Sequence, residues 1–134
     1  MKTVLQFLAV AAVVIFPQIE QALAADKANW KIGRVYNRLV CNSCHRQDGG
    51  KVVSPYDRNK VDWTAYFLSD AHDVTGKTNP SVRHYMSTDY RQSIKSVNKA
   101  AAKFVDMPNA QMEAHVIAFY HHGAKDSDTP AKCQ

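Results

Sequence analysis

The stretch from Cys41 to His45 constrains this chain more than any other, because it reads C-N-S-C-H. Two cysteines separated by two residues present both sulfurs on one side of a single backbone turn. The histidine that follows directly is then held beside them. Two thiols in this spacing, followed at once by an imidazole, form the attachment signature of a c-type haem. The sequence therefore predicts a chain that folds around one covalently bound haem c and its iron.

Each residue of the motif has its own role in this chemistry. Cys41 and Cys44 would each add a thiol across one vinyl group of the haem and form a thioether bond. His45 would supply a neutral imidazole nitrogen as the proximal ligand of the iron. A bare C-x-x-C also fits a redox-active dithiol or half of a zinc site. The chain has no second C-x-x-C or C-x-x-H that would complete a zinc site, so we prefer haem attachment.

Residues 1–24 have the pattern of a secretory signal peptide. Lys2 supplies a positive start, residues 4–16 form an apolar run broken at one position, and Ala22-Leu23-Ala24 has the small-x-small form of a cleavage site. The run is shorter than the ~20 apolar residues that span a bilayer, and an uncleaved membrane anchor is the alternative. We therefore expect an exported, periplasmic protein, since covalent haem attachment of this kind takes place outside the cytoplasm.

The rest of the chain suits one small domain, at residues 25–123, followed by a polar tail at residues 124–134. The formal net charge of +5 favours redox partner proteins with acidic docking surfaces. No Arg/Lys run alternates with aromatic residues, so nucleic acid is not expected as a partner. Membrane contact is expected only through a membrane-bound redox partner. Cys133 is left over, and it would either link two chains in a dimer or complex or stay an idle thiol.

Apolar residues at helical spacing predict an all-α domain without strands. The expected helices are 26–40, 60–68, 90–104 and 108–122, and Gly123 ends the last of them. A glycine inside the first helix, Gly33, would permit a close helix crossing. The positions expected to face the core include Val61, Leu68 and Val97. The histidines of the last helix, His115, His121 and His122, are expected at the surface.

The order of these features resembles class I cytochrome c over most of the domain. The matching features are a first helix, C-x-x-C-H, a glycine-bearing loop, short helices and a Met107-Pro108 step before a last apolar helix. In that family the first and last helices cross near the haem, and Gly33, Tyr36 and Tyr120 look like the matching contact. The resemblance implies a single-haem carrier of one electron at a time, which is not an enzyme. The alternatives are a haem subunit of a larger redox complex, or a haem sensor with a weak or open distal site.

The resemblance also implies roles for residues around the haem. Met107 is similar to the family's distal ligand, opposite His45, and the Pro55 carbonyl is similarly placed to the one that orients the proximal imidazole. Met86, His84, the remaining histidines and an open site stay alternatives to Met107. The residues that could line the haem or bond its propionates are Trp63, Tyr66, Tyr85 and Arg58.

Overall fold

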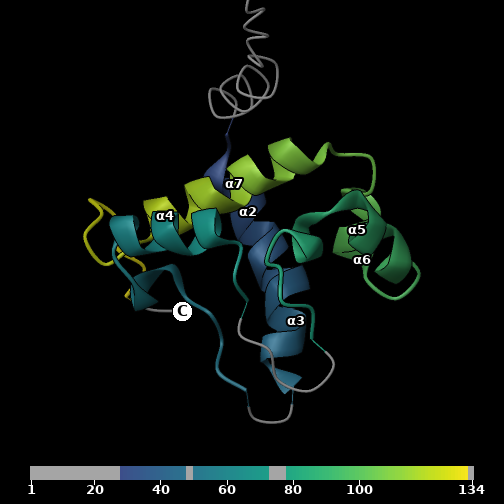
Figure 1. The fold of residues 1–134 in the computed structure, drawn as a ribbon, viewed down its shortest axis with the longest axis horizontal. Helices are drawn as coiled ribbons and strands as arrows, with labels where there is room; N and C mark the ends of the chain where they lie inside the picture. Colours follow the sequence, from purple (N-terminus) through teal and green to yellow (C-terminus); the bar gives the residue numbers. More distant parts are fainter. Residues whose placement is uncertain (1–27, 48–49, 73–77, 133–134) are drawn as a thin grey trace, which may run out of the picture.

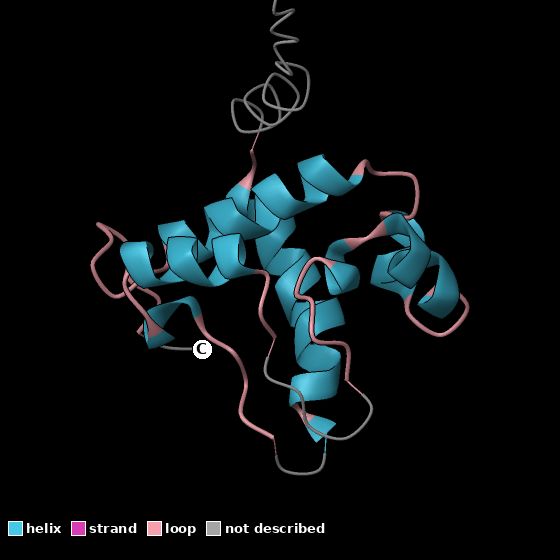
Figure 2. Ribbon diagram, in the orientation of Figure 1, coloured by secondary structure: helices cyan, strands magenta, loops and turns pink. Residues whose placement is uncertain are grey.

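The computed structural model describes residues 28–47, 50–72 and 78–132. The predicted signal peptide at 1–24 and Cys133 lie outside these residues. Across the described part of the chain the structure is helical, and its β structure is limited to one isolated antiparallel bridge. The predicted all-α class is therefore confirmed for these residues (Figure 2). Over the same ranges, no helix is both long enough and apolar enough to cross a membrane.

Nine helical elements are described, and the first three form one continuous helical segment. In chain order they are α2 (Trp30–Tyr36), η1 (Asn37–Cys41), α3 (Asn42–His45), η3 (Pro55–Asp57), α4 (Lys60–Ser69), η4 (His84–Met86), α5 (Thr88–Ile94), α6 (Lys99–Lys103) and α7 (Asn109–His122). η1 is a turn of π-helix, while η3 and η4 are 3-10 helices. The C-x-x-C-H motif thus occupies the far end of the first helical segment, pointing away from α7 (Figure 1).

α2 and α7 pack directly against each other and cross at Gly33. A Cβ at Gly33 would stand 2.0 Å from the backbone oxygen of His115, so any larger residue would force the helices apart. Below the crossing, the Tyr120 hydroxyl donates a 2.6 Å hydrogen bond to Oδ1 of buried Asn37. The predicted close crossing of the first and last helices is therefore confirmed, and it positions the motif.

The core lies between α7 and the elements around it. Its buried apolar side chains are Tyr36, Val40, Trp63, Phe67, Met86, Ala100, Phe104, Met112, Val116, Phe119, Tyr120 and Ala124. Aromatic rings make up much of this set, and they come from α2, α4 and α7 as well as the end of α6.

The first and third predicted helices have wrong boundaries. The first begins at Trp30, because the Asn29 side chain accepts a hydrogen bond from the Lys31 amide at 3.0 Å and caps it. The predicted helix at 90–104 is broken, because Asn98 instead caps α6 and accepts hydrogen bonds from two of its first amides. Val97 lies in the break and is 86% exposed, so the prediction that it faces the core is wrong.

α4 matches its predicted position but buries a narrower stripe than expected. Trp63 and Phe67, one turn apart, are buried against the core, whereas Val61 and Leu68 are 70% and 72% exposed. The predicted inward orientation of Val61 and Leu68 is wrong. α4 packs against α7 with one face, so the side chains on its other faces stay exposed.

His115 is buried, so its predicted surface position is wrong. It lies at the α2–α7 crossing with 2% of its surface exposed, and its Nδ1 accepts a hydrogen bond from the Asn29 amide at 2.9 Å. Burial lowers the pKa of His115. His122 is half-buried, because its ring stacks on Trp30 with centroids 3.9 Å apart.

The residues after α7 fold back on the domain rather than extending from it. The Lys125 amide donates to the Arg58 carbonyl at 3.0 Å, and the Lys60 amide donates to Oδ1 of Asp126 at 2.8 Å. The predicted polar tail is therefore packed beside the start of α4. Gly123, which ends α7 as predicted, allows this return, because a Cβ there would stand 2.8 Å from the Cβ of Pro55.

Candidate functional site

The two cysteines of the motif lie on the last turns of the first helical segment. Asn42, between them, is buried and exchanges two hydrogen bonds with the backbone of Val53: its Oδ1 accepts at 3.0 Å and its Nδ2 donates at 3.3 Å. The loop backbone at Val53 therefore holds the motif turn in place. Cys41 is partly buried and Cys44 is exposed, and both are free thiols.

Cys41 faces the interior of the domain. Burial raises the pKa of its thiol to about 12. The phenols of Tyr36 and Tyr120 lie close enough to interact electrostatically with it, and burial raises the pKa of both phenols as well. A redox-active C-x-x-C needs a lowered thiol pKa, because the thiolate is the nucleophile. The surroundings of Cys41 are the opposite of that environment.

Cys44 faces a different set of rings. Burial raises the pKa of the Tyr90 phenol to about 12. The neighbouring Cys44 sulfur, which shares a hydrogen bond with this phenol, adds to the increase. The next residue, His45, is partly buried, and burial followed by the nearby ring of His72 lowers its pKa. The rings of His45 and His72 have centroids 5.9 Å apart and planes inclined by 62°.

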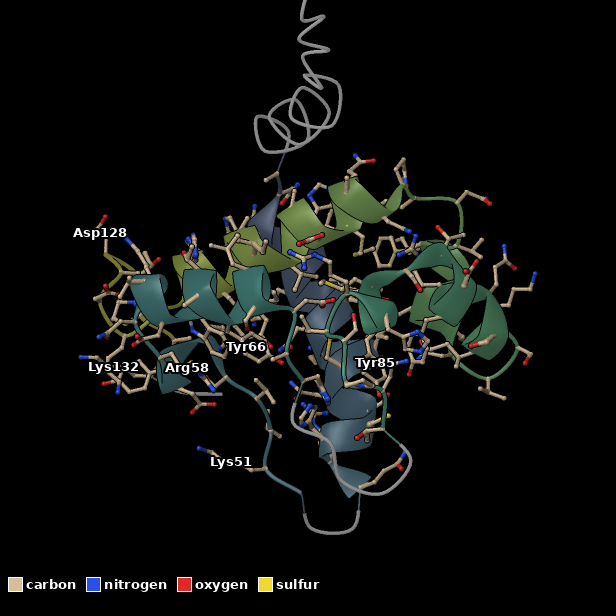
Figure 3. All side chains as sticks on the ribbon, viewed as in Figure 1. Lys51, Arg58, Tyr66, Tyr85, Asp128 and Lys132 are labelled. Carbon is tan, nitrogen blue, oxygen red and sulfur yellow. The ribbon has the colours of Figure 1, made fainter. Side chains whose placement is uncertain are left out.

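A group of rings continues from His45 away from the motif. We call these side chains the loop aromatic group: His45, His72, His84, Tyr85 and Tyr90. Successive centroids lie 5.0 Å apart for His72 and Tyr85, 5.0 Å for Tyr85 and Tyr90, and 5.1 Å for His84 and Tyr85. Figure 3 shows Tyr85 beside the first helical segment, on the opposite side from Tyr66.

A second group of rings lies across the motif, on α4 and α7. We call these rings, together with the guanidinium of Arg58 that lies over two of them, the helix aromatic group: Arg58, Trp63, Tyr66, Phe67 and Tyr120. The Arg58 guanidinium lies 5.4 Å from the Trp63 ring centre and 5.2 Å from that of Tyr66. Trp63 in turn packs on Tyr120 at 4.3 Å. The structure thus brings together three of the four predicted haem-lining residues, Arg58, Trp63 and Tyr66, whereas Tyr85 belongs to the loop aromatic group.

The Pro55 carbonyl has a different partner from the one expected. It accepts a hydrogen bond from the indole Nε1 of buried Trp63 at 2.7 Å. A capping box at the start of η3, in which Ser54 and Asp57 exchange side-chain and backbone hydrogen bonds, fixes this orientation. The structure therefore gives Pro55 a role in placing Trp63, and the ring of His45 lies against His72 instead.

The methionine candidates are both connected to a buried arginine. Arg91, fully buried on α5, donates to the backbone carbonyls of Met86 and Met107. Met86 is a core residue, and Met107 is partly buried in the connection between α6 and α7. Figure 1 shows that connection at the upper right, between α6 and the start of α7, while α3 lies at the bottom of the view. The structure thus places Met107 at the edge of the core, where Arg91 holds its carbonyl, and its role as distal ligand stays a prediction.

An open hollow of about 560 Å³ lies beside the helix aromatic group. Its lining residues are Asp57, Arg58, Asn59, Asp62, Ala65, Tyr66, Ser69, Ala71 and Lys125. The volume falls within the range of about 300–1,000 Å³ that is usual for ligand sites. Arg58 and Lys125 place two cations there and Asp57 and Asp62 place two carboxylates, so the lining has no net formal charge.

The donor set present fits a covalently bound haem. Two free thiols and an imidazole occur in the required order on one helical segment, and a second imidazole lies opposite the first. No group of three or more His, Cys, Asp or Glu side chains within the described ranges is arranged to hold a metal ion. A haem iron needs only axial ligands from the protein, because the macrocycle supplies the others.

His72, Tyr90 and Arg91 are among the residues near the site that the sequence did not single out individually. His72 is one histidine in a polar loop, and Arg91 is one cation on a short helix, so neither has a local pattern that marks it.

A scan against protein-family models, a search of curated proteins and a search of solved structures each gave no match to this chain.

Proposed function

We propose that this protein is an exported c-type cytochrome that carries one electron at a time between redox partners. The observation that carries the proposal is the placement of Cys41, Cys44 and His45 on the end of one helical segment, with aromatic groups on both sides. Thiols in this position would add across the two vinyl groups, each sulfur bonding one vinyl carbon while its hydrogen passes to the other. His45 would then be the proximal ligand.

When bound, a haem c supplies an iron atom that gains and loses a single electron. The chain's own residues would bind, orient and shield the macrocycle. Trp63 and Tyr66 offer ring surface, and Arg58 offers a guanidinium for a propionate. Electron transfer of this kind needs no acid or base from the protein, so we propose a carrier rather than an enzyme.

The first helical segment also offers a surface for an acidic redox partner. Residues 30–46 carry four cations and no Asp or Glu. These cations are Lys31, Arg34, Arg38 and Arg46, and all four are exposed. Exposed charges of one sign on the segment that ends in the motif would steer a negatively charged partner toward it.

The dependence of the electron-transfer rate on salt concentration tests this docking surface. Transfer to a physiological partner should slow as salt rises from low concentration to ~0.15 M, because the Debye length then falls to ~8 Å. Arg38→Glu should lower the rate at low salt more than Lys132→Glu does, because Arg38 lies in the exposed basic stretch beside the motif. A rate that is independent of salt, or equal effects of the two variants, would contradict a docking role for this segment.

A haem subunit held in a larger redox complex is a second candidate. Three large apolar side chains are exposed on neighbouring elements, namely Val35, Leu39 and Val97. The Asn98 side chain donates to the Leu39 carbonyl at 2.8 Å, which places the end of the α5–α6 connection against η1. Clustered exposed apolar residues are typical of protein–protein contacts. Co-purification of a stable partner that Leu39→Asp releases would favour this candidate.

A redox titration of the purified mature protein tests the carrier function. The proposal predicts one couple per chain with a one-electron Nernst slope, and one iron per chain. A two-electron couple that disappears in Cys41→Ser would instead show a dithiol–disulfide pair. The absence of any couple would contradict both.

A further inference from the structure

The two imidazoles of His45 and His72 stand at the separation that two axial ligands of one iron require. Their ring centres are 5.9 Å apart. Imidazoles that face each other across a metal, each at a metal–nitrogen bond of about 2 Å, have ring centres about 6 Å apart. The inclination of 62° between the rings is compatible with this, because each ring can rotate about its own metal–nitrogen bond.

His72 also carries a polar atom that lacks a partner. Its Nδ1 is buried and makes no hydrogen bond in the structure. Buried polar atoms are nearly always satisfied, so an unsatisfied one calls for an explanation such as an absent ion. Either ring nitrogen of histidine can bind a metal. A bond from Nδ1 to iron would satisfy this atom.

The backbone from Asp70 to His72 is held by contacts with residues 80–83. The His72 amide donates to the Pro80 carbonyl at 2.7 Å, beside the bridge between Ala71 and Ser81. Asp70 ends α4 in a left-handed conformation with φ of 50°, which aspartate tolerates better than most residues. These contacts fix the position of the chain where it leaves α4.

The Asp70 carboxylate joins the two ends of this loop. One oxygen accepts from the Ser81 hydroxyl at 2.7 Å, and the other accepts from the Arg83 amide at 2.9 Å. Arg83 is itself held by Glu113 of α7 at 2.9 Å and by the Phe67 carbonyl at 2.9 Å. His72 is therefore positioned by the two longest described helices, α4 and α7, before any ligand binds.

We propose that His72, through Nδ1, is the second axial ligand of the iron, opposite His45 and in place of Met107. This inference rests on the proposed function, because it presumes a haem attached at the motif. His84 belongs to the same loop aromatic group, but its ring contacts Tyr85 and Tyr90 rather than His45. With two imidazole ligands, the iron would have a lower reduction potential than with one imidazole and one thioether ligand.

The test uses the mature holoprotein with His72→Ala, Met107→Ala and His84→Ala, the last as a matched control from the same ring group. Intact mass after acid-acetone extraction first shows that each variant keeps its haem. The readouts are the carbon monoxide affinity of the reduced protein, the near-infrared sulfur-to-iron band of the oxidised protein, and the spectrum after addition of free imidazole.

The inference predicts no sulfur-to-iron band in the unchanged protein. Only His72→Ala should bind carbon monoxide, with an affinity raised at least tenfold, and free imidazole should restore the original spectrum. His72→Gln, which keeps a polar side chain of similar length, serves as a second variant if the alanine change prevents folding.

Several results would overturn the inference. The first is a carbon monoxide site that is opened by Met107→Ala or His84→Ala but not by His72→Ala. The second is a sulfur-to-iron band in the unchanged protein. The third is an unchanged protein that already binds carbon monoxide as tightly as the His72→Ala variant does. A protein that holds haem mass but shows one of these results loses only the His72 assignment. A protein without covalent haem loses the proposed function, and the His72 assignment with it.

Discussion

The helix aromatic group and the loop aromatic group flank the same motif but are built in opposite ways. In the helix group, the indole of Trp63 donates to the Pro55 carbonyl and the phenol of Tyr120 donates to Asn37, so its buried polar atoms are satisfied. The loop group contains the buried, unpartnered Nδ1 of His72. Its rings belong to partly buried residues, whereas Trp63 and Tyr120 are almost fully buried.

This difference separates a structural role from a functional one. A buried, satisfied aromatic cluster contributes to stability through its area and its hydrogen bonds. A partly exposed cluster with an unsatisfied nitrogen contributes less to stability and is available for a ligand. We therefore expect substitutions on the helix side to change mainly folding, and substitution of His72 on the loop side to change mainly the ligation of the proposed haem iron.

The largest expected effect follows from removing Trp63. Trp63→Ala should reduce the free energy of unfolding by about 3–5 kcal/mol, because it leaves a large cavity in the core. It also deprives the Pro55 carbonyl of its donor. Urea denaturation followed by circular dichroism measures this loss in the mature protein.

Two control variants sharpen the same measurement. Leu68→Ala, at a 72% exposed position on the same helix, should change stability by no more than about 0.5 kcal/mol. His72→Ala should cost less than about 1 kcal/mol, since it removes a partly buried ring with an unsatisfied atom. A His72→Ala cost equal to that of Trp63→Ala would show that both groups are structural.

A smaller effect is expected from a single hydroxyl on the helix side. Tyr120→Phe removes the 2.6 Å hydrogen bond to Asn37 and leaves the buried amide oxygen without that donor. The expected loss is about 1–3 kcal/mol. Tyr90→Phe, on the loop side, should cost less than about 1 kcal/mol, because that residue is only partly buried. Equal losses for the two variants in urea denaturation would remove the contrast between the groups.

The smallest expected effect is a pH dependence of stability caused by His115, at the α2–α7 crossing. Burial lowers the pKa of His115 in the folded protein relative to its unfolded value of about 6.5. The unfolded state therefore binds more protons at acid pH, so this contribution to stability is complete above about pH 6.5 and is lost as the pH falls below it.

Thermal unfolding from pH 7.5 to about pH 5 tests the assignment to His115. The melting temperature should decline less at acid pH in His115→Gln than in the unchanged protein. His122→Gln, at the half-buried end of α7, serves as the control. A decline that is unchanged in His115→Gln would mean that other groups cause the acid sensitivity.

The periodic parts of the fold were predictable from the sequence because they follow local rules. α4 and α7 were expected close to their observed positions, and Gly33 was expected to permit a close helix crossing. Errors arose where capping decided the outcome: Asn29 and Asn98 each begin a helix, and the second divides a stretch whose apolar spacing indicated one continuous helix. Spacing alone does not show which asparagine side chain will compete for backbone amides.

The candidate site was predictable only in part, for a related reason. Cys41, Cys44 and His45 were identifiable because their chemistry lies within five consecutive residues. The partners of these residues come from distant parts of the chain. His72 reaches the motif through a loop whose two ends are joined by Asp70, and no local pattern encodes that contact.

The central claim is that haem is covalently attached at Cys41 and Cys44, and intact-mass spectrometry tests it most directly. The protein should be produced with its full chain in a host that exports and matures c-type cytochromes, then extracted with acid-acetone. The account predicts a mature chain beginning near residue 25 with the mass of one haem added, and no added mass in Cys41→Ser/Cys44→Ser. An unmodified mature chain, or haem that extracts freely, would contradict the account.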